Sequence, residues 1–150
     1  MKPMIDWRGP GRGGGAAVSR QLLADRVGKA RNGSEHSLLY LHIHGLSEAH
    51  AHALQRALAH LTGNLLGPVL MLALGRTEVV LFLEHWSAVR ARQLGELLKR
   101  EILRSLGTTS GLRVGAGVAA FWGSADLQER IEQARNDCAS VLSHGRATPA

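Results

Sequence analysis

Two short apolar runs that flank a break form the most constraining feature of this sequence. Residues 67–74 (GPVLMLAL) and 78–84 (EVVLFLE) are each long enough for one strand, and Gly75-Arg76-Thr77 between them leaves room for a tight turn. Apolar runs of this length around a turn predict a buried β-hairpin at residues 68–84. Because a buried hairpin needs cover, we expect helices to pack on the sheet that contains it.

The remaining elements follow from hydrophobic periodicity. Two further strands are predicted at residues 37–43 and 112–121, and four helices at 19–31, 47–61, 85–107 and 124–145. The resulting order is α–β–α–β–β–α–β–α. The predicted fold class is therefore α/β (α+β), with a central mixed or antiparallel sheet and helices packed on it.

The positive charge of the chain is concentrated at its N-terminus. Residues 1–31 hold seven basic and two acidic side chains, a charge of +5 out of a total of +6. The rest is therefore nearly neutral, so we do not expect the folded part to bind nucleic acid. Composition divides the chain into a flexible Gly/Arg-rich arm (1–17), a domain (18–146) and a C-terminal tail (147–150).

The arm nevertheless contains a short apolar cluster with arginines beside it. This candidate partner-binding segment consists of Met4, Ile5, Trp7, Arg8 and Arg12. Aromatic and arginine side chains are frequent interface anchors, so we expect docking on a protein partner or self-association. Two alternatives stay open: contact with RNA or acidic lipid through the arginines, and a plain linker.

The single cysteine and the distribution of apolar residues indicate a cytoplasmic protein. Cys138 excludes a disulfide within the chain and lies on the inward stripe of the last predicted helix. The first 20 residues contain no apolar signal core. The most apolar stretch, residues 65–83, is interrupted at Gly75-Arg76-Thr77-Glu78, so we expect no membrane span.

Four short motifs, in order, resemble those of the GGDEF domain, the diguanylate cyclase fold. The segment after the first predicted core strand, usually D-x-D-x-F-K, is HIHGL at 42–46, and the name motif is GRTEV at 75–79. The last strand, 114–119, keeps Gly117-Val118-Ala119, and the last helix keeps Ala134, Gly145 and Arg146. The resemblance covers residues 20–146 and implies a nucleotidyl cyclase-like fold.

The departures from these motifs remove most of the expected metal ligands. The family holds divalent metal between carboxylates, but His42, His44 and Thr77 occupy three of the acidic positions, and only Glu78 survives. Magnesium requires hard oxygen ligands, and the metal activates the attacking hydroxyl. Arg76 also replaces the second glycine of the name motif. The resemblance therefore implies a degenerate domain with no catalytic residues, no metal and no cofactor.

A second family site is also missing from the sequence. Many members carry an R-x-x-D motif five residues before the name motif, where it binds cyclic di-GMP, but residues 66–69 here are LGPV. We therefore expect no tight cyclic di-GMP binding at the usual inhibitory site.

These features predict a regulatory role in place of catalysis. The first hypothesis is a protein-binding adaptor or regulatory subunit in a bacterial cyclic-di-GMP-linked pathway, such as exopolysaccharide production; the resemblance alone implies the pathway. The alternative is a sensor that binds a nucleotide or metal ion in the altered cleft around His42, His44, Arg76 and Glu78. Imidazole suits zinc, nickel or copper better than magnesium.

Overall fold

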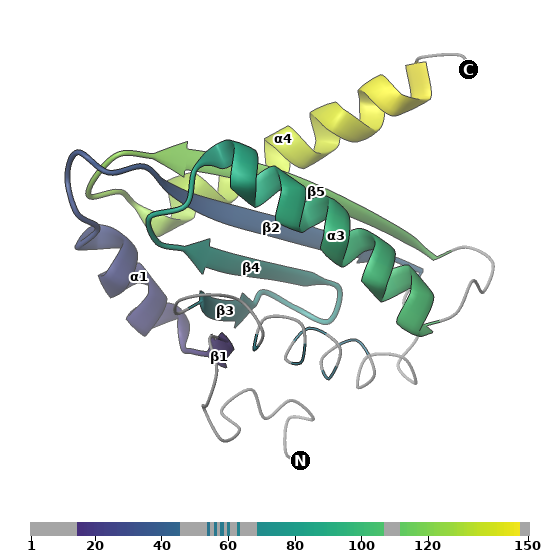
Figure 1. The fold of residues 1–150 in the computed structure, drawn as a ribbon, viewed down its shortest axis with the longest axis horizontal. Helices are drawn as coiled ribbons and strands as arrows, with labels where there is room; N and C mark the ends of the chain where they lie inside the picture. Colours follow the sequence, from purple (N-terminus) through teal and green to yellow (C-terminus); the bar gives the residue numbers. More distant parts are fainter. Residues whose placement is uncertain are drawn as a thin grey trace.

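In the part of the chain that the computed structural model describes, one five-stranded sheet carries helices on both faces (Figure 1). The structure describes residues 15–45, 54, 56, 58, 60, 63, 69–106 and 112–147. The elements with assigned bounds are β1 (Gly15–Ala17), α1 (Arg20–Gly28), β2 (His36–His44), β3 (Val69–Ala73), β4 (Glu78–Leu83), α3 (Ala88–Leu106), β5 (Arg113–Phe121) and α4 (Leu127–Ala147).

The predicted hairpin is confirmed as the antiparallel pair β3–β4. Leu70 pairs with Phe82 and Ala73 with Val79, and the Leu74 N–H donates to the Glu78 carbonyl at 2.8 Å to close the turn. The strand order is β1-β3-β4-β2-β5, with β1 parallel to β3 and the other pairs antiparallel. The sheet is therefore mixed, and the predicted fold class is confirmed.

The first strand of the sheet lies nearer the N-terminus than the sequence predicts. Residues 15–17, assigned to the flexible arm, form β1 against β3, and the next residue, Val18, donates its N–H to the Met71 carbonyl at 3.0 Å. Periodicity could not reveal a three-residue edge strand made of Gly15, Ala16 and Ala17, because backbone hydrogen bonds alone define it. The candidate arm residues Met4, Ile5, Trp7, Arg8 and Arg12 lie outside the described residues.

Each face of the sheet carries its own apolar core. On one face, Leu39, Leu41 and Ile43 of β2 pack with α3 and with Leu54 and Leu58, which lie in the predicted 47–61 helix. Positions 54, 56, 58, 60 and 63 are helical, and the rest of that helix lies outside the described residues. On the other face, residues of β2 and β4 pack against α1 and α4: Leu38, Tyr40, Val80, Phe82, Leu23, Val27, Ile131, Ala134 and Cys138. Burial on both faces explains why these strands are continuous apolar runs.

Two expectations about individual segments can be compared directly with the structure. Cys138 is buried in the second core, as predicted, and burial raises the pKa of its thiol. No helix in the described part of the chain is long and apolar enough to cross a membrane.

Close packing of α4 on β5 depends on Gly117. A Cβ atom at this position would lie 2.1 Å from the Ala134 carbonyl oxygen and 2.5 Å from the Cys138 backbone nitrogen. Both atoms belong to the backbone of α4, so neither can rotate away. The missing side chain therefore sets how closely the helix approaches the strand, which gives a physical reason for the glycine in the last-strand motif.

We predict that Gly117→Ala will lower the free energy of unfolding by about 3 kcal/mol, because α4 must move off the sheet to admit the methyl group. Urea unfolding followed by circular dichroism measures this. Gly28→Ala is the matched control, because nothing lies within 4 Å of a Cβ atom there. Equal unfolding midpoints for the two variants would contradict the close packing of α4 on β5.

Candidate functional site

The end of β2 brings three ring side chains together on one face of the sheet. Tyr40, His42 and His44 alternate along the strand, so they point to the same side. The ring centroids of His42 and His44 lie 3.9 Å apart, and those of Tyr40 and His42 6.3 Å apart. Across the β2–β4 ladder, His42 pairs with Glu78 at the start of β4. The structure thus places His42, His44 and Glu78 in one cluster.

Glu78 is held by two donors from different elements. The Tyr40 hydroxyl donates to Glu78 Oε2, and Arg135 of α4 approaches the carboxylate with Nε and Nη2, each at 3.4 Å. Arg135 Nη1 also contacts Glu132 Oε2 at 3.1 Å, and the guanidinium lies 5.8 Å from the Tyr40 ring centroid. The surviving acidic residue of the name motif is therefore engaged within the protein.

The protonation of the cluster follows from these contacts. The hydrogen bond from Tyr40 lowers the pKa of Glu78 despite partial burial, and Arg135 lowers it further. Burial, together with the Glu78 carboxylate, raises the pKa of Tyr40. Burial and the neighbouring His44 lower the pKa of His42. At neutral pH the cluster thus consists of an ionised Glu78, a protonated Tyr40 hydroxyl and a neutral His42 imidazole.

This chemistry does not match a magnesium site. Magnesium prefers several oxygen ligands in octahedral geometry, whereas the flanking side chains here are imidazoles. A cation near Glu78 would also meet the positive charge of Arg135, which lies 3.4 Å from the same carboxylate. Within the described residues, no group of three or more His, Cys, Asp or Glu side chains is placed to hold a metal ion.

In the turn before Glu78, Thr77 makes a backbone hydrogen bond and Arg76 is exposed to solvent. Thr77 accepts a hydrogen bond from the Ile43 N–H to its carbonyl at 2.9 Å, so its backbone ties the hairpin to the end of β2. Arg76 is exposed in the turn immediately before β4. The binding roles of His42, His44, Arg76 and Glu78 stay predictions.

Sequence reasoning missed two members of the cluster, Tyr40 and Arg135. Tyr40 could have been found by extending the His42–His44 alternation back by two residues. Arg135 is harder to find, because it comes from α4, 57 positions after Glu78. One signal was available: in the last-helix motif, Arg135 follows Ala134 where the family has an aspartate.

Comparison with known proteins identifies the architecture. No family model and no curated protein matches the sequence. Solved structures do match. The GGDEF domain of DgcB from Caulobacter crescentus, solved with c-di-GMP, aligns with a TM-score of 0.67 and 14% identity over 97% of this chain and 90% of that one. An active GGEEF domain of a Vibrio cholerae diguanylate cyclase aligns with a TM-score of 0.60 and 13% identity, over 83% of this chain and 84% of that one. The diguanylate cyclase SiaD from Pseudomonas aeruginosa, in complex with its activator SiaC, aligns with a TM-score of 0.57 and 15% identity. This alignment covers 84% of this chain and 55% of SiaD.

The chain has the fold of a GGDEF domain. Each sequence motif falls on a described element of this fold. Residues 75–79 form the β3–β4 turn and the start of β4, residues 114–119 lie in β5, and residues 134–146 lie in α4. His42 and His44 end β2 beside the turn. The β3–β4 turn and the end of β2, which carry two of the motifs, thus lie side by side.

We predict that Tyr40→Phe will raise the pKa of Glu78, because the variant removes only the hydroxyl that donates to the carboxylate. NMR titration of the Glu78 side-chain carbon measures the shift. His44→Gln is the control, since it removes an exposed imidazole and leaves both donors in place.

The same variant has a predictable effect on stability. A carboxyl whose pKa is lower in the folded than in the unfolded state stabilises the fold above its unfolded pKa. That contribution is lost as the pH falls through the folded value. Tyr40→Phe should therefore cost roughly 1–2 kcal/mol at neutral pH, with a smaller difference in acid. A pH-independent difference would contradict the proposed hydrogen bond.

Proposed function

We propose that this chain is a catalytically inactive GGDEF-like domain that acts by binding other proteins. The observation that carries the proposal is the state of Glu78, whose carboxylate receives the Tyr40 hydroxyl and the Arg135 guanidinium. Its neighbours His42 and His44 are imidazoles where a cyclase has carboxylates.

Electrostatics favours the loss of cyclase chemistry. Phosphoryl transfer on a nucleoside triphosphate uses divalent metal to balance the developing phosphate charge. The cleft of this chain offers one carboxylate, already neutralised by Arg135 at 3.4 Å. Releasing Glu78 for a metal would leave the buried Tyr40 hydroxyl without its acceptor and the guanidinium with Glu132 as its remaining partner, which costs free energy.

The regulatory setting is proposed from the solved structures with this fold. One was solved with c-di-GMP and another in complex with an activator protein. A domain that keeps the fold without the chemistry suits an adaptor or regulatory subunit in a bacterial cyclic-di-GMP-linked pathway, such as exopolysaccharide production. The single cysteine, Cys138, agrees with a cytosolic setting.

The N-terminal arm is the proposed partner-binding element. Met4, Ile5 and Trp7 form an apolar cluster beside Arg8 and Arg12. Because β1 begins at Gly15, a variant that tests the arm must keep residues 15–17, whose removal would strip a strand from the sheet.

A ligand sensor is the second candidate, and the histidine pair favours it. The rings of His42 and His44 lie 3.9 Å apart, and burial keeps the pKa of His42 low. Neutral imidazoles on one strand suit zinc, nickel or copper.

We predict that the protein forms no cyclic di-GMP from GTP with magnesium or manganese, because Glu78 is the only acidic side chain left at the expected metal positions. Product above a no-protein control, measured by chromatography, tests this. Turnover that disappears in Glu78→Ala would overturn the inactive assignment.

Thermal shift separates the two candidate functions in the same samples. An adaptor shows no shift with GTP or zinc. A saturable shift with zinc that is lost in His42→Asn, with the melting temperature of the free protein unchanged, would favour the sensor.

We also predict no tight binding of cyclic di-GMP, since residues 66–69 (LGPV) lack the arginine and aspartate of the usual inhibitory motif. Isothermal titration calorimetry measures this. A dissociation constant in the low micromolar range, about −8 kcal/mol, would contradict the prediction. Loss of such binding in Arg8→Ala and Arg12→Ala would assign it to the arm.

A further inference from the structure

A groove of about 450 Å³ runs along the outer edge of β5, between α3 and α4. Ala88 and Arg92 of α3 form one wall, and Gln133, Asn136 and Asp137 of α4 form the other. Val118, Ala120 and Trp122 line the groove from β5 and the residue after it. It is separate from the Tyr40–Glu78–Arg135 cluster.

The floor of this β5 groove is an open sheet edge. Among the strands that the structure describes, β5 is the last in the order and pairs with β2 alone. The Val118 N–H points outward, because it donates to Asp137 Oδ2 at 2.8 Å. Alternate residues of an antiparallel strand direct their N–H and C=O groups to the same side, so the backbone groups of Ala120 also face the groove. An edge of this kind can accept an added strand.

An exposed tryptophan lines the groove, and an exposed valine follows one of its lining residues in the sequence. Trp122 is 60% exposed and Val89, next to Ala88 at the start of α3, is 68% exposed. They exceed the other exposed large apolar side chains in the described part of the chain, Leu22 at 45% and Leu97 at 41%. An exposed tryptophan beside an open strand edge is typical of an interface anchor.

The groove also presents one charge of each sign. Arg92 binds Asp137 through two contacts, Nη1 to Oδ2 at 2.8 Å and Nη2 to Oδ1 at 3.3 Å. Burial alone would raise the pKa of Asp137, but Arg92 and the Val118 N–H lower it, so the carboxylate is ionised. The groove is neutral as a whole and suits a segment that is apolar and carries both charges.

We propose that the β5 groove binds residues 4–8 (MIDWR) of the N-terminal arm of a second copy of this chain, added as a strand to β5. The proposal rests on the proposed role as a protein-binding domain and names its partner. In an extended segment, Ile5 and Trp7 point to one side, and Met4, Asp6 and Arg8 to the other.

The chemistry of the segment matches the groove. Ile5 and Trp7 would face Trp122 and Val89 on the α3 side. Asp6 and Arg8 would then face the α4 side, where the guanidinium of Arg92 reaches Asp137. They carry opposite charges two residues apart, so Asp6 can meet this guanidinium and Arg8 can meet Asp137. The backbone of the segment would supply hydrogen bonds to Ala120.

The length of the arm favours a second copy over the same chain. The arm leaves the sheet at β1, on the edge opposite β5, and four inter-strand spacings separate these edges, about 19 Å. The seven residue steps from Arg8, the last docked residue, to Gly15 span at most about 25 Å, which leaves little more than a direct path.

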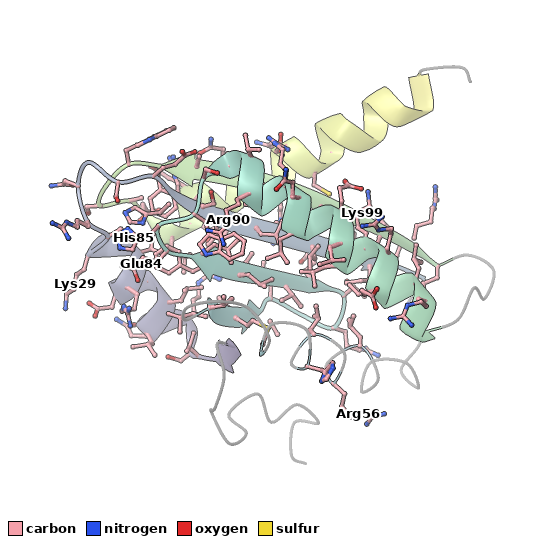
Figure 2. All side chains as sticks on the ribbon, viewed as in Figure 1. Lys29, Arg56, Glu84, His85, Arg90 and Lys99 are labelled. Carbon is pink, nitrogen blue, oxygen red and sulfur yellow. The ribbon has the colours of Figure 1, made fainter. Side chains whose placement is uncertain are left out.

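Loops occupy that direct path at the end of the sheet where β1 begins. His36 fixes two of them: its Nε2 donates to the Arg31 carbonyl at 2.9 Å, and its Nδ1 accepts the His85 N–H at 3.0 Å. Figure 2 shows Lys29, Glu84 and His85 together at this end of the molecule. A path around these loops must be longer than the direct one, whereas an arm from another copy does not have to cross this end of the sheet.

The test is sedimentation of the full-length protein over a range of concentrations, without nucleotide. The wild type should associate, and Trp122→Ser and Trp7→Ala should each weaken association by at least about tenfold. A mixture of the two variants should form heterodimers, because one supplies an intact arm and the other an intact groove. Leu97→Ser, an exposed leucine elsewhere on α3, is the control and should associate like the wild type.

Three outcomes would overturn the proposal: a monomeric wild type, undiminished association of Trp122→Ser, or a mixture of variants that stays monomeric. Ala120→Pro provides a second check. An edge strand tolerates proline where the N–H points outward, so the variant should fold but lack the N–H that an added strand would bind, and association should weaken. The GTP assay is independent of these results. If the protein does not associate, the proposal that it lacks cyclase activity still stands. If it turns over GTP, that proposal is overturned but the proposed interface is not affected.

Discussion

The burial of β2 on both faces is the constraint on which the rest of this structure depends. The strand pairs with β4 and β5, and its side chains enter both apolar cores. A central strand of this kind must be covered by helices on each side, because its backbone and its apolar side chains have no access to water. The placement of α3, α1 and α4 follows from that need. The same strand ends in His42 and His44, so the core also determines where the candidate cleft lies.

The close approach of α4 to β5 links packing to the chemistry of the cleft. Gly117 lets the helix backbone rest on the strand, with the Ala134 carbonyl where a side chain would otherwise be. The next residue of the helix, Arg135, then reaches Tyr40 and Glu78. A contact that stabilises the fold thus also brings a permanent positive charge to the surviving acidic residue. The Arg135–Glu78 salt bridge thus neutralises this carboxylate from within the protein.

The proposed loss of cyclase chemistry makes the edges of the sheet the next surfaces to consider for binding. Strand β1 occupies the edge at β3, while the edge at β5 is protected at one point, where Asp137 accepts the Val118 N–H. Open edges normally invite unwanted pairing, and a charged side chain at the edge limits it. The Arg92–Asp137 pair does this beside Val118 and leaves Ala120 and Trp122 accessible. The β5 groove therefore leaves a short stretch of the strand, at Ala120 and Trp122, open to an added segment.

The sequence by itself determined the elements with strong periodicity: the hairpin around Gly75-Arg76-Thr77, the α3 and α4 helices, and strands β2 and β5. It also located the GGDEF-like motifs and the shared face of His42 and His44, because these depend on local alternation. Only the tertiary structure decided that Gly15–Ala17 join the sheet, that Arg135 meets Glu78, and that Trp122 borders an open groove. Each of these features brings together residues that are far apart in sequence. Contacts of this kind do not produce a periodic pattern in the sequence. Local patterns in the sequence indicate which side of a helix or strand is buried. Which elements become neighbours is determined only when the helices pack on the sheet.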